Sequence, residues 1–327
     1  MKDAIELFVT LGERLRDFGH NDATQRVIAC ACEANGWFTP AEICRAISAL
    51  SAQMLRRDAL CAWLKPYAVP VAVPRRVLVV MAGNIPLVGF FDLLCVLASG
   101  HRCLIKPSSK DSVLMEYIIN LLHDIAPETA VELYDGDAPV DAVIATGGDD
   151  ANRYFKARYA GISSLLRGSR SSVAVLSGHQ TKEQLAALSD DIWAYSGLGC
   201  RNVSLIFLPE GCELKLQMPT MNAKYRNNYV QTRTLLAMTG QSFVDLGTAV
   251  ALEQCAFPTA LSQIAYAHYR TIAEVEAWLS AHDTELQCVV SECVQHSRCV
   301  RFGCAQAPTL TDYADEKDVI AFLVALN

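Results

Sequence analysis

The sequence has no apolar run long enough to cross a bilayer, which takes about 20 residues. Its longest candidate, residues 77–97, is interrupted by two glycines, an asparagine, a proline and an aspartate. Residues 1–6 contain acidic side chains and no apolar stretch of the kind that forms a signal peptide. We therefore expect a cytoplasmic protein without membrane insertion.

Strong charge of either sign is also missing. Charged residues make up 19% of the chain, the net charge is −7, and the basic residues are scattered. Such a chain has no basic surface for nucleic acid or anionic lipid. In contrast, 52% of the 327 residues are hydrophobic, which is enough for a large core, and this length predicts about two domains. Internal repeats, low-complexity tracts and Pro/Gly/Ser linkers are absent.

Thirteen cysteines are present, but the number is odd and the chain is large, so reduced and mostly buried thiols are expected. One group could form a zinc-binding or redox-sensing module that acts as a binding protein. Its spacing is looser than the paired knuckles of structural zinc sites. The group consists of Cys288, Cys293, Cys299 and Cys304 with His282 and His296.

The pattern of apolar residues predicts an α/β fold. Helical spacing covers a segment at residues 1–65, with one helix starting at Thr39-Pro40. Strand and helix then alternate, which predicts an open parallel Rossmann-like sheet with helices on both faces, as a cofactor-binding domain over 66–190. A second α/β catalytic lobe is expected at 191–299, and residues 300–327 return to the first domain. The expected helices include residues 86–98, 214–228 and 249–253.

Two segments suggest covalent chemistry. Gly197-Leu198-Gly199 precedes Cys200, so a cysteine stands before a strand where the backbone can approach a substrate closely. Asn84 follows a buried strand and could direct its amide at a developing oxyanion. The alternatives are that Cys200 is one of many buried thiols, and that Asn84 caps the helix in which Pro86 would stand.

Two further segments suggest a cofactor. Lys106 and Ser108 follow a strand, where a side chain reaches the edge of a parallel sheet at which ligands bind. Gly147 and Gly148 open a helix and could admit a phosphate, but two aspartates follow and no complete G-x-G-x-x-G is present.

In their order and positions, these segments resemble the aldehyde dehydrogenase superfamily, and most closely its acyl-CoA reductase branch. The resemblance runs over about residues 77–326. It implies that Asn84 binds the thioester carbonyl oxygen and that Cys200 is the nucleophile. It also implies that the cofactor is held by Lys106 and Ser108, by the turn Thr146-Gly147-Gly148, and by Gly168. Arg301-Phe302-Gly303 corresponds to the Pro-Phe-Gly element at which the chain returns to the cofactor domain.

Departures from the family pattern narrow the expected reaction. Oxidising members have Glu-Leu-Gly-Gly, whose glutamate activates water, where this chain has Leu165-Leu166-Arg167-Gly168. Leucine cannot abstract a proton, so hydrolysis of an acyl-enzyme should be poor. The arginine also stands where a glycine is expected. The missing glutamate favours reduction of an acyl thioester to an aldehyde over production of a free acid. The chain is also shorter than typical members.

The expected partner is an acyl-CoA or an acyl carrier protein thioester, and a homo-oligomer is possible. Ser109-Lys110, with Arg102 upstream, would place cations near a ribose 2′-phosphate, which favours NADPH over NADH. The alternatives are an aldehyde dehydrogenase that acts on free aldehydes and a relative that keeps the fold without catalysis.

Overall fold

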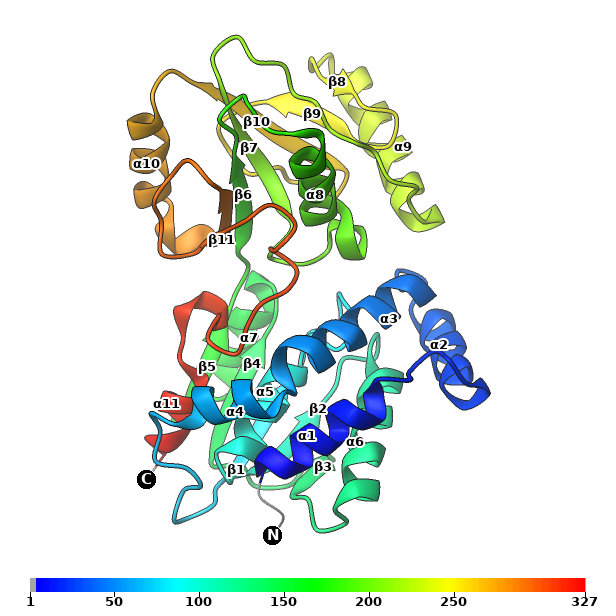
Figure 1. Cartoon of the computed structure of the whole chain (residues 1–327), viewed down its shortest axis with the longest axis vertical. Helices are drawn as coiled ribbons and strands as arrows, with labels where there is room; N and C mark the ends of the chain where they lie inside the picture. The colour runs from blue at the N-terminus through cyan, green and yellow to red at the C-terminus, as the bar shows by residue number, and fades with distance from the viewer. Residues whose placement is uncertain (1–3, 327) are drawn as a thin grey trace. The chain divides into compact units, whose positions relative to one another are not determined.

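A computed structural model describes residues 4–326. Contacts divide them into two compact units, residues 4–169 with 308–326, and residues 170–307. We call them unit 1 and unit 2 and describe each by itself (Figure 1). No helix of the described residues is long and apolar enough to cross a membrane.

The N-terminal part of unit 1 is helical, as the apolar spacing predicts. It consists of α1 (Ala4–Leu15), α2 (Asp22–Ala34), α3 (Pro40–Ala49), a π-helical turn (Leu50–Met54) and α4 (Arg57–Leu64). Thr39 caps α3 and Pro40 occupies its first turn, as expected. The apolar faces of these helices join the main core of unit 1.

A five-stranded parallel sheet, sheet A, forms the centre of unit 1, with the strand order β3-β2-β1-β4-β5. Its elements are β1 (Arg76–Val80), α5 (Phe90–Ala98), β2 (Arg102–Lys106), α6 (Ser112–Ile125), β3 (Val131–Leu133), β4 (Ala142–Thr146), α7 (Asp149–Arg158) and β5 (Ser163–Arg167), with α11 (Val319–Val324) from the C-terminal segment. One face packs against α5, α6, α11 and the N-terminal helices, and the other packs against α7.

Unit 2 contains a seven-stranded sheet, sheet B, with the order β12-β11-β6-β7-β10-β9-β8. All pairs are parallel except β8 with β9. Its elements are β6 (Ser171–Val175), α8 (Lys182–Trp193), β7 (Val203–Pro209), α9 (Ala223–Thr239), β8 (Val244–Asp245), β9 (Val250–Glu253), β10 (Gln263–Tyr269), α10 (Ile272–Ala281), β11 (Leu286–Ser291) and β12 (Cys299–Val300). In Figure 1, α10 lies on one face of sheet B, and α8 and α9 lie on the other.

The predicted fold class is confirmed, because two parallel α/β units follow a helical N-terminal segment. Three predicted helices are wrong in part or whole. In place of the helix expected at 249–253, Val250–Glu253 form strand β9, and the helix expected at 214–228 is α9, which begins only at Ala223. The helix expected to start at Pro86 begins at Phe90. The domain limits predicted from the sequence stay a prediction.

Candidate active site

The carboxyl ends of four neighbouring strands of sheet A present the residues predicted to bind cofactor and substrate. Asn84 follows β1, Lys106 ends β2, Thr146 ends β4 and Gly168 follows β5. These strands lie side by side in the order β2-β1-β4-β5. The sheet thus brings together residues from separate motifs at the edge where ligands of parallel α/β sheets bind.

The loop after β1 lies directly against the loop after β2. A Cβ atom at Gly83 would be 2.5 Å from both Cβ and Oγ of Ser108, a distance that any larger residue would have to relieve. The hydroxyl of Ser108 accepts a hydrogen bond from the backbone N–H of Lys110 at 3.3 Å. Glycine at position 83 therefore allows the predicted ribose-binding serine to sit beside the segment that contains Asn84.

Asn84 is not a helix cap. The N-cap of α5 is Gly89, and residues 84–89 form a turn before the helix. Leu87 in this turn has φ 55°, a left-handed conformation that is uncommon for leucine. Asp111 secures it by accepting the backbone N–H of Leu87 at 2.8 Å. The capping alternative is therefore wrong, and half-buried Asn84 belongs to a fixed turn at the ligand-binding edge.

Asp111 is itself an unusual group at this edge. It is 4% exposed, and burial raises the pKa of its carboxyl to about 8. Its Oδ1 atom is buried without a hydrogen-bond partner among the described residues. Sequence reasoning missed Asp111, because nothing local distinguishes it from an ordinary aspartate at a helix start.

The turn after β4 is closely packed against the helix that follows. A Cβ atom at Gly147 would lie 2.8 Å from that of Ala151. Gly148 is the N-cap of α7, and the first turn of this helix contains Asp149 and Asp150. These carboxylates already complement the helix dipole, so this N-terminus is poorly suited to a phosphate.

Strand β5 shows what replaces the family's glutamate. Leu165 is 6% exposed and packs in the main core of unit 1, beside its register neighbour Ile144. The side chain of Arg167 forms a buried ion pair with Asp92 of α5. Its Nε also donates to the hydroxyl of Thr146 at 3.0 Å. At the position that the resemblance aligns with the water-activating glutamate, this strand therefore has a buried aliphatic side chain.

The Arg102 expected near the cofactor lies elsewhere. It begins β2, whereas Lys106 ends it. At about 3.3 Å per residue, the two positions are roughly 13 Å apart along the strand. Arg102 therefore belongs to the opposite edge of sheet A, and only Ser109 and Lys110 lie next to Ser108. Both are exposed.

In unit 2, Cys200 is exposed at the tip of a closed turn. The backbone N–H of Asn202 donates to the carbonyl of Gly199 at 3.1 Å. In return, the N–H of Gly199 donates to the side-chain oxygen of Asn202 at 2.8 Å. These two bonds hold Cys200 and Arg201 as the central residues of a four-residue turn, directly before β7. The alternative that Cys200 is a buried structural thiol is therefore wrong.

Asn202 also fixes the chain that leads into this turn. It is 4% exposed, and its Nδ2 donates to the carbonyls of Asp191, Ile192 and Ala194 at 3.2, 3.1 and 2.9 Å. The chain then passes through three residues with positive φ, at 54°, 57° and 71°, namely Tyr195, Ser196 and Gly197. Consecutive left-handed residues that are not glycine are strained, and such strain is concentrated at functional sites.

A family model described as acyl-CoA reductase (LuxC) matches residues 56–219 of this chain. The chain belongs to the acyl-CoA reductase (LuxC) family. The match includes both segments described above, the one with Asn84 and the one with Cys200. The protein is therefore an oxidoreductase of the aldehyde dehydrogenase type. No curated protein matched the chain by sequence.

Solved structures show the same fold. Aldehyde dehydrogenase 21 from Physcomitrella patens, in complex with the reaction product succinate, has a TM-score of 0.70 at 11% identity, over 99% of this chain and 84% of that one. An oxidoreductase from Marinobacter aquaeolei has a TM-score of 0.64 at 14% identity, over 94% of this chain and 78% of that one. The NAD+ complex of an aldehyde dehydrogenase from Bacillus cereus has a TM-score of 0.62 at 15% identity, over 85% of this chain and 69% of that one.

The segment around residues 301–305 is held in place by a buried carboxylate. Asp191 of α8 is fully buried and accepts the N–H groups of Gly303 and Ala305 at 2.6 and 2.9 Å. Burial raises the pKa of Asp191 to about 6, although both hydrogen bonds act in the opposite direction. Residues 301–303, the counterpart of the Pro-Phe-Gly element, are thus tied to the helix that leads to Cys200.

The cysteines and histidines of the zinc hypothesis have other contacts. His282 stacks on Trp278, with ring centroids 4.0 Å apart, and Cys288 lies 3.1 Å from the hydroxyl of Ser172. Within residues 4–326, no group of three or more His, Cys, Asp or Glu side chains is arranged to hold a metal ion.

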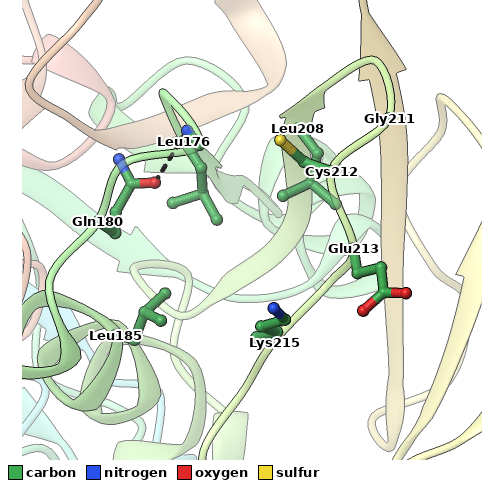
Figure 2. A pocket seen from close by; sticks show the side chains of 9 residues that line it. Leu176, Gln180, Leu185, Leu208, Gly211, Cys212, Glu213 and Lys215 are labelled. Atoms are coloured by element: carbon green, nitrogen blue, oxygen red, sulfur yellow. Dashed lines mark hydrogen bonds between the residues drawn. The ribbon is translucent and has the colours of Figure 1, made fainter.

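One pocket of about 450 Å³ lies in unit 2, at the carboxyl ends of β6 and β7 (Figure 2). Its walls include Leu176, Leu185 and Cys212, with Lys215 at the side. Cys200 precedes β7, so it belongs to the opposite, amino edge of the same sheet. The pocket is therefore not the site of the predicted nucleophile.

Proposed function

We propose that this protein reduces an acyl thioester to an aldehyde, with a reduced nicotinamide dinucleotide as hydride donor and Cys200 as the nucleophile. The observation that supports the proposal best is the exposed Cys200 at the tip of its hydrogen-bonded turn. Because a thiolate must approach a carbonyl carbon along a defined direction, a fixed and accessible sulfur suits this task.

The reaction begins when the Cys200 thiolate attacks the carbonyl carbon of the thioester. A new C–S bond forms, the oxyanion develops, and the coenzyme or carrier thiolate leaves when the carbonyl reforms. The family resemblance assigns the Asn84 amide and the Cys200 N–H to the oxyanion. A bound reduced nicotinamide supplies a hydride. Collapse of the resulting thiohemiacetal releases the aldehyde and returns the Cys200 thiolate.

The residues at the edge of sheet A fit a dinucleotide. Lys106 is exposed at the end of β2, and the absence of a side chain at Gly83 lets Ser108 lie directly against the loop that contains Asn84. We propose that Lys106 and Ser108 hold the ribose, and that Thr146, Gly147, Gly148 and Gly168 pack against the cofactor. For the 2′-phosphate of NADPH, Lys110 is the cation that remains after Arg102 is excluded. Lys110→Glu should therefore weaken NADPH binding more than NADH binding in a fluorescence titration.

Buried Leu165 favours reduction over oxidation of free aldehydes. A side chain in the core cannot activate a deacylating water, so an acyl-enzyme would persist until hydride or another thiol resolves it. An acyl-CoA and an acyl carrier protein are both suitable donors for this step. Assembly into a homo-oligomer stays a prediction.

The decisive experiment compares the unmodified protein with Cys200→Ala. We expect NADPH oxidation and aldehyde formation with one or more acyl-CoAs, and loss of both in Cys200→Ala with cofactor binding retained. Cys255→Ala, which changes another exposed cysteine of unit 2, is the matched control and should remain active. Near-normal aldehyde production by Cys200→Ala would refute the proposal. NADP+ reduction with free aldehyde and water, but no acyl-CoA reduction, would favour the alternative dehydrogenase.

A further inference from the structure

Ser172 lies beneath the turn that contains Cys200. It is the second residue of β6 and is fully buried. Its hydroxyl donates a hydrogen bond to the backbone carbonyl of Cys200 at 2.9 Å. The same oxygen accepts the backbone N–H and the thiol of Cys288, both at 3.1 Å. One buried hydroxyl therefore connects β6 and β11 with the turn before β7, at the amino edge of sheet B.

The sheet is irregular at this point. The pairing of β6 with β7 shifts between Ser172 and Val173, and the pairing of β6 with β11 shifts between Leu286 and Val289. Such irregularities are frequent next to active sites, where they redirect a side chain or end the pairing. The N–H of Cys288 bonds to the Ser172 hydroxyl within this irregular stretch, so the side chain contributes to the contact between β6 and β11.

The donor and acceptor capacity of the Ser172 hydroxyl matches the contacts that it makes. A serine hydroxyl has one proton to donate and two lone pairs to accept with. The N–H and the S–H of Cys288 both point to this oxygen, and the thiol also lies 3.9 Å from the carbonyl of Arg201. The hydroxyl proton of Ser172 is left for the carbonyl of Cys200. Burial keeps Cys288 a donor, because it raises the pKa of this thiol to about 11.

Both peptide groups that flank Cys200 are thereby held in place. The backbone N–H of Asn202 donates to the carbonyl of Gly199 on one side, and the hydroxyl of Ser172 donates to the carbonyl of Cys200 on the other. We propose that Ser172 is a positioning residue that, supported by Cys288, fixes the orientation of the nucleophilic Cys200. This inference rests on the proposed function of Cys200 and assigns no direct contact between Ser172 and the substrate.

The chain offers a matched control at the other edge of the same strands. Ser291, 4% exposed, donates to the carbonyl of Val175 at 3.0 Å and accepts the N–H of Cys293 at 3.1 Å. Its hydroxyl also lies 3.4 Å from the Cys293 thiol. Ser291 thus repeats the contacts of Ser172 at the carboxyl edge of sheet B, whereas Cys200 precedes β7 at the amino edge.

The test compares Ser172→Ala with Ser291→Ala in two assays. The first measures kcat and KM for acyl-CoA reduction. The second follows alkylation of Cys200 by iodoacetamide in the cofactor-free protein over a range of pH, with the Cys200 peptide quantified by mass spectrometry. We expect Ser172→Ala to lower kcat about tenfold, with the KM for NADPH unchanged, and to alter the pH profile of alkylation. Ser291→Ala should stay within about twofold in both assays, and Ser172→Thr, which keeps the hydroxyl, should recover part of the rate.

Normal kcat and normal alkylation in Ser172→Ala would overturn the inference. An equal loss in Ser291→Ala would also overturn it, because the effect would then be a general weakening of sheet B. If the unmodified protein reduces no acyl-CoA, the proposed function fails, while the alkylation comparison still decides whether Ser172 positions Cys200.

Discussion

At the scale of single residues, the buried ion pair between Arg167 and Asp92 distinguishes unit 1 of this protein. The arginine occupies a place where the resemblance leads one to expect glycine, and both side chains are more than nine-tenths buried. Buried ion pairs add little to stability over an apolar pair of similar volume, but an unpaired partner is costly. The pair therefore makes each of its members difficult to replace alone.

Arg167→Met should destabilise unit 1 by about 3–5 kcal/mol, because it leaves the Asp92 carboxylate buried without its cation. The double variant Arg167→Met/Asp92→Leu should regain most of this loss. Urea unfolding of the three proteins measures the difference. A single variant as stable as the unmodified protein would show that Asp92 is not charged in the folded chain.

The carboxyl of Asp111 should make stability depend on pH. Burial raises its pKa from the ordinary value of 3.8 to about 8, so the folded chain keeps a proton that the unfolded chain releases. Its contribution is fully present below about pH 4 and is lost as the pH rises to about 8. The free energy of unfolding, relative to Asp111→Asn, should therefore fall between about pH 5 and 8 in urea titrations. The control is the variant Asp124→Asn, at an exposed site near the end of α6.

At the scale of elements, two helices that both follow a threonine differ in how their N-termini are capped. Thr181 before α8 and Thr271 before α10 both stand at an N-cap. Thr181 forms a complete capping box with Gln184, whereas the Thr271 side chain forms no cap hydrogen bond. The N-cap side chain therefore secures the start of α8 but not the start of α10.

Thr181→Ala should weaken the first turn of α8 by about 1 kcal/mol, because the backbone N–H of Gln184 loses its partner, the Thr181 hydroxyl. Thr271→Ala should cost only a few tenths of that amount. Amide hydrogen exchange of the two helix starts measures both effects. Equal losses at the two sites would contradict the capping assignment.

Element prediction failed where local signals were ambiguous. Residues 249–253 are apolar and short, and such a run fits a buried strand as well as a helix. These residues belong to sheet B because they pair with β10, and nothing in the neighbouring sequence predicts that pairing. Strands β5 and β10 were missed for a related reason, since neither has an apolar run as continuous as that of β1.

For the molecule as a whole, the predicted functions fall in separate units. Lys106 and Ser108 belong to unit 1, and Cys200 belongs to unit 2. Each unit has its own sheet and its own core. Changes that affect cofactor binding and changes that affect the nucleophile should therefore be separable.

Lys106→Ala should weaken NADPH binding about tenfold, through loss of a charged hydrogen-bond donor to the ribose. The rate of Cys200 alkylation in the cofactor-free protein should not change. Fluorescence titration and mass spectrometry supply the two readouts. Reduced alkylation together with unchanged cofactor affinity would contradict the division of roles.

The sequence by itself determined the class of fold, the N-terminal helices and the motifs around Asn84, Lys106, Thr146 and Cys200. These features depend on neighbouring residues, whose periodicity and turn chemistry are local. Only the tertiary structure identified the partners, because Arg167 and Asp92 are 75 residues apart and Ser172 and Cys288 are 116 apart. Side chains so distant in sequence meet only after the sheets form, and burial then decides which of them are charged, strained or held in place.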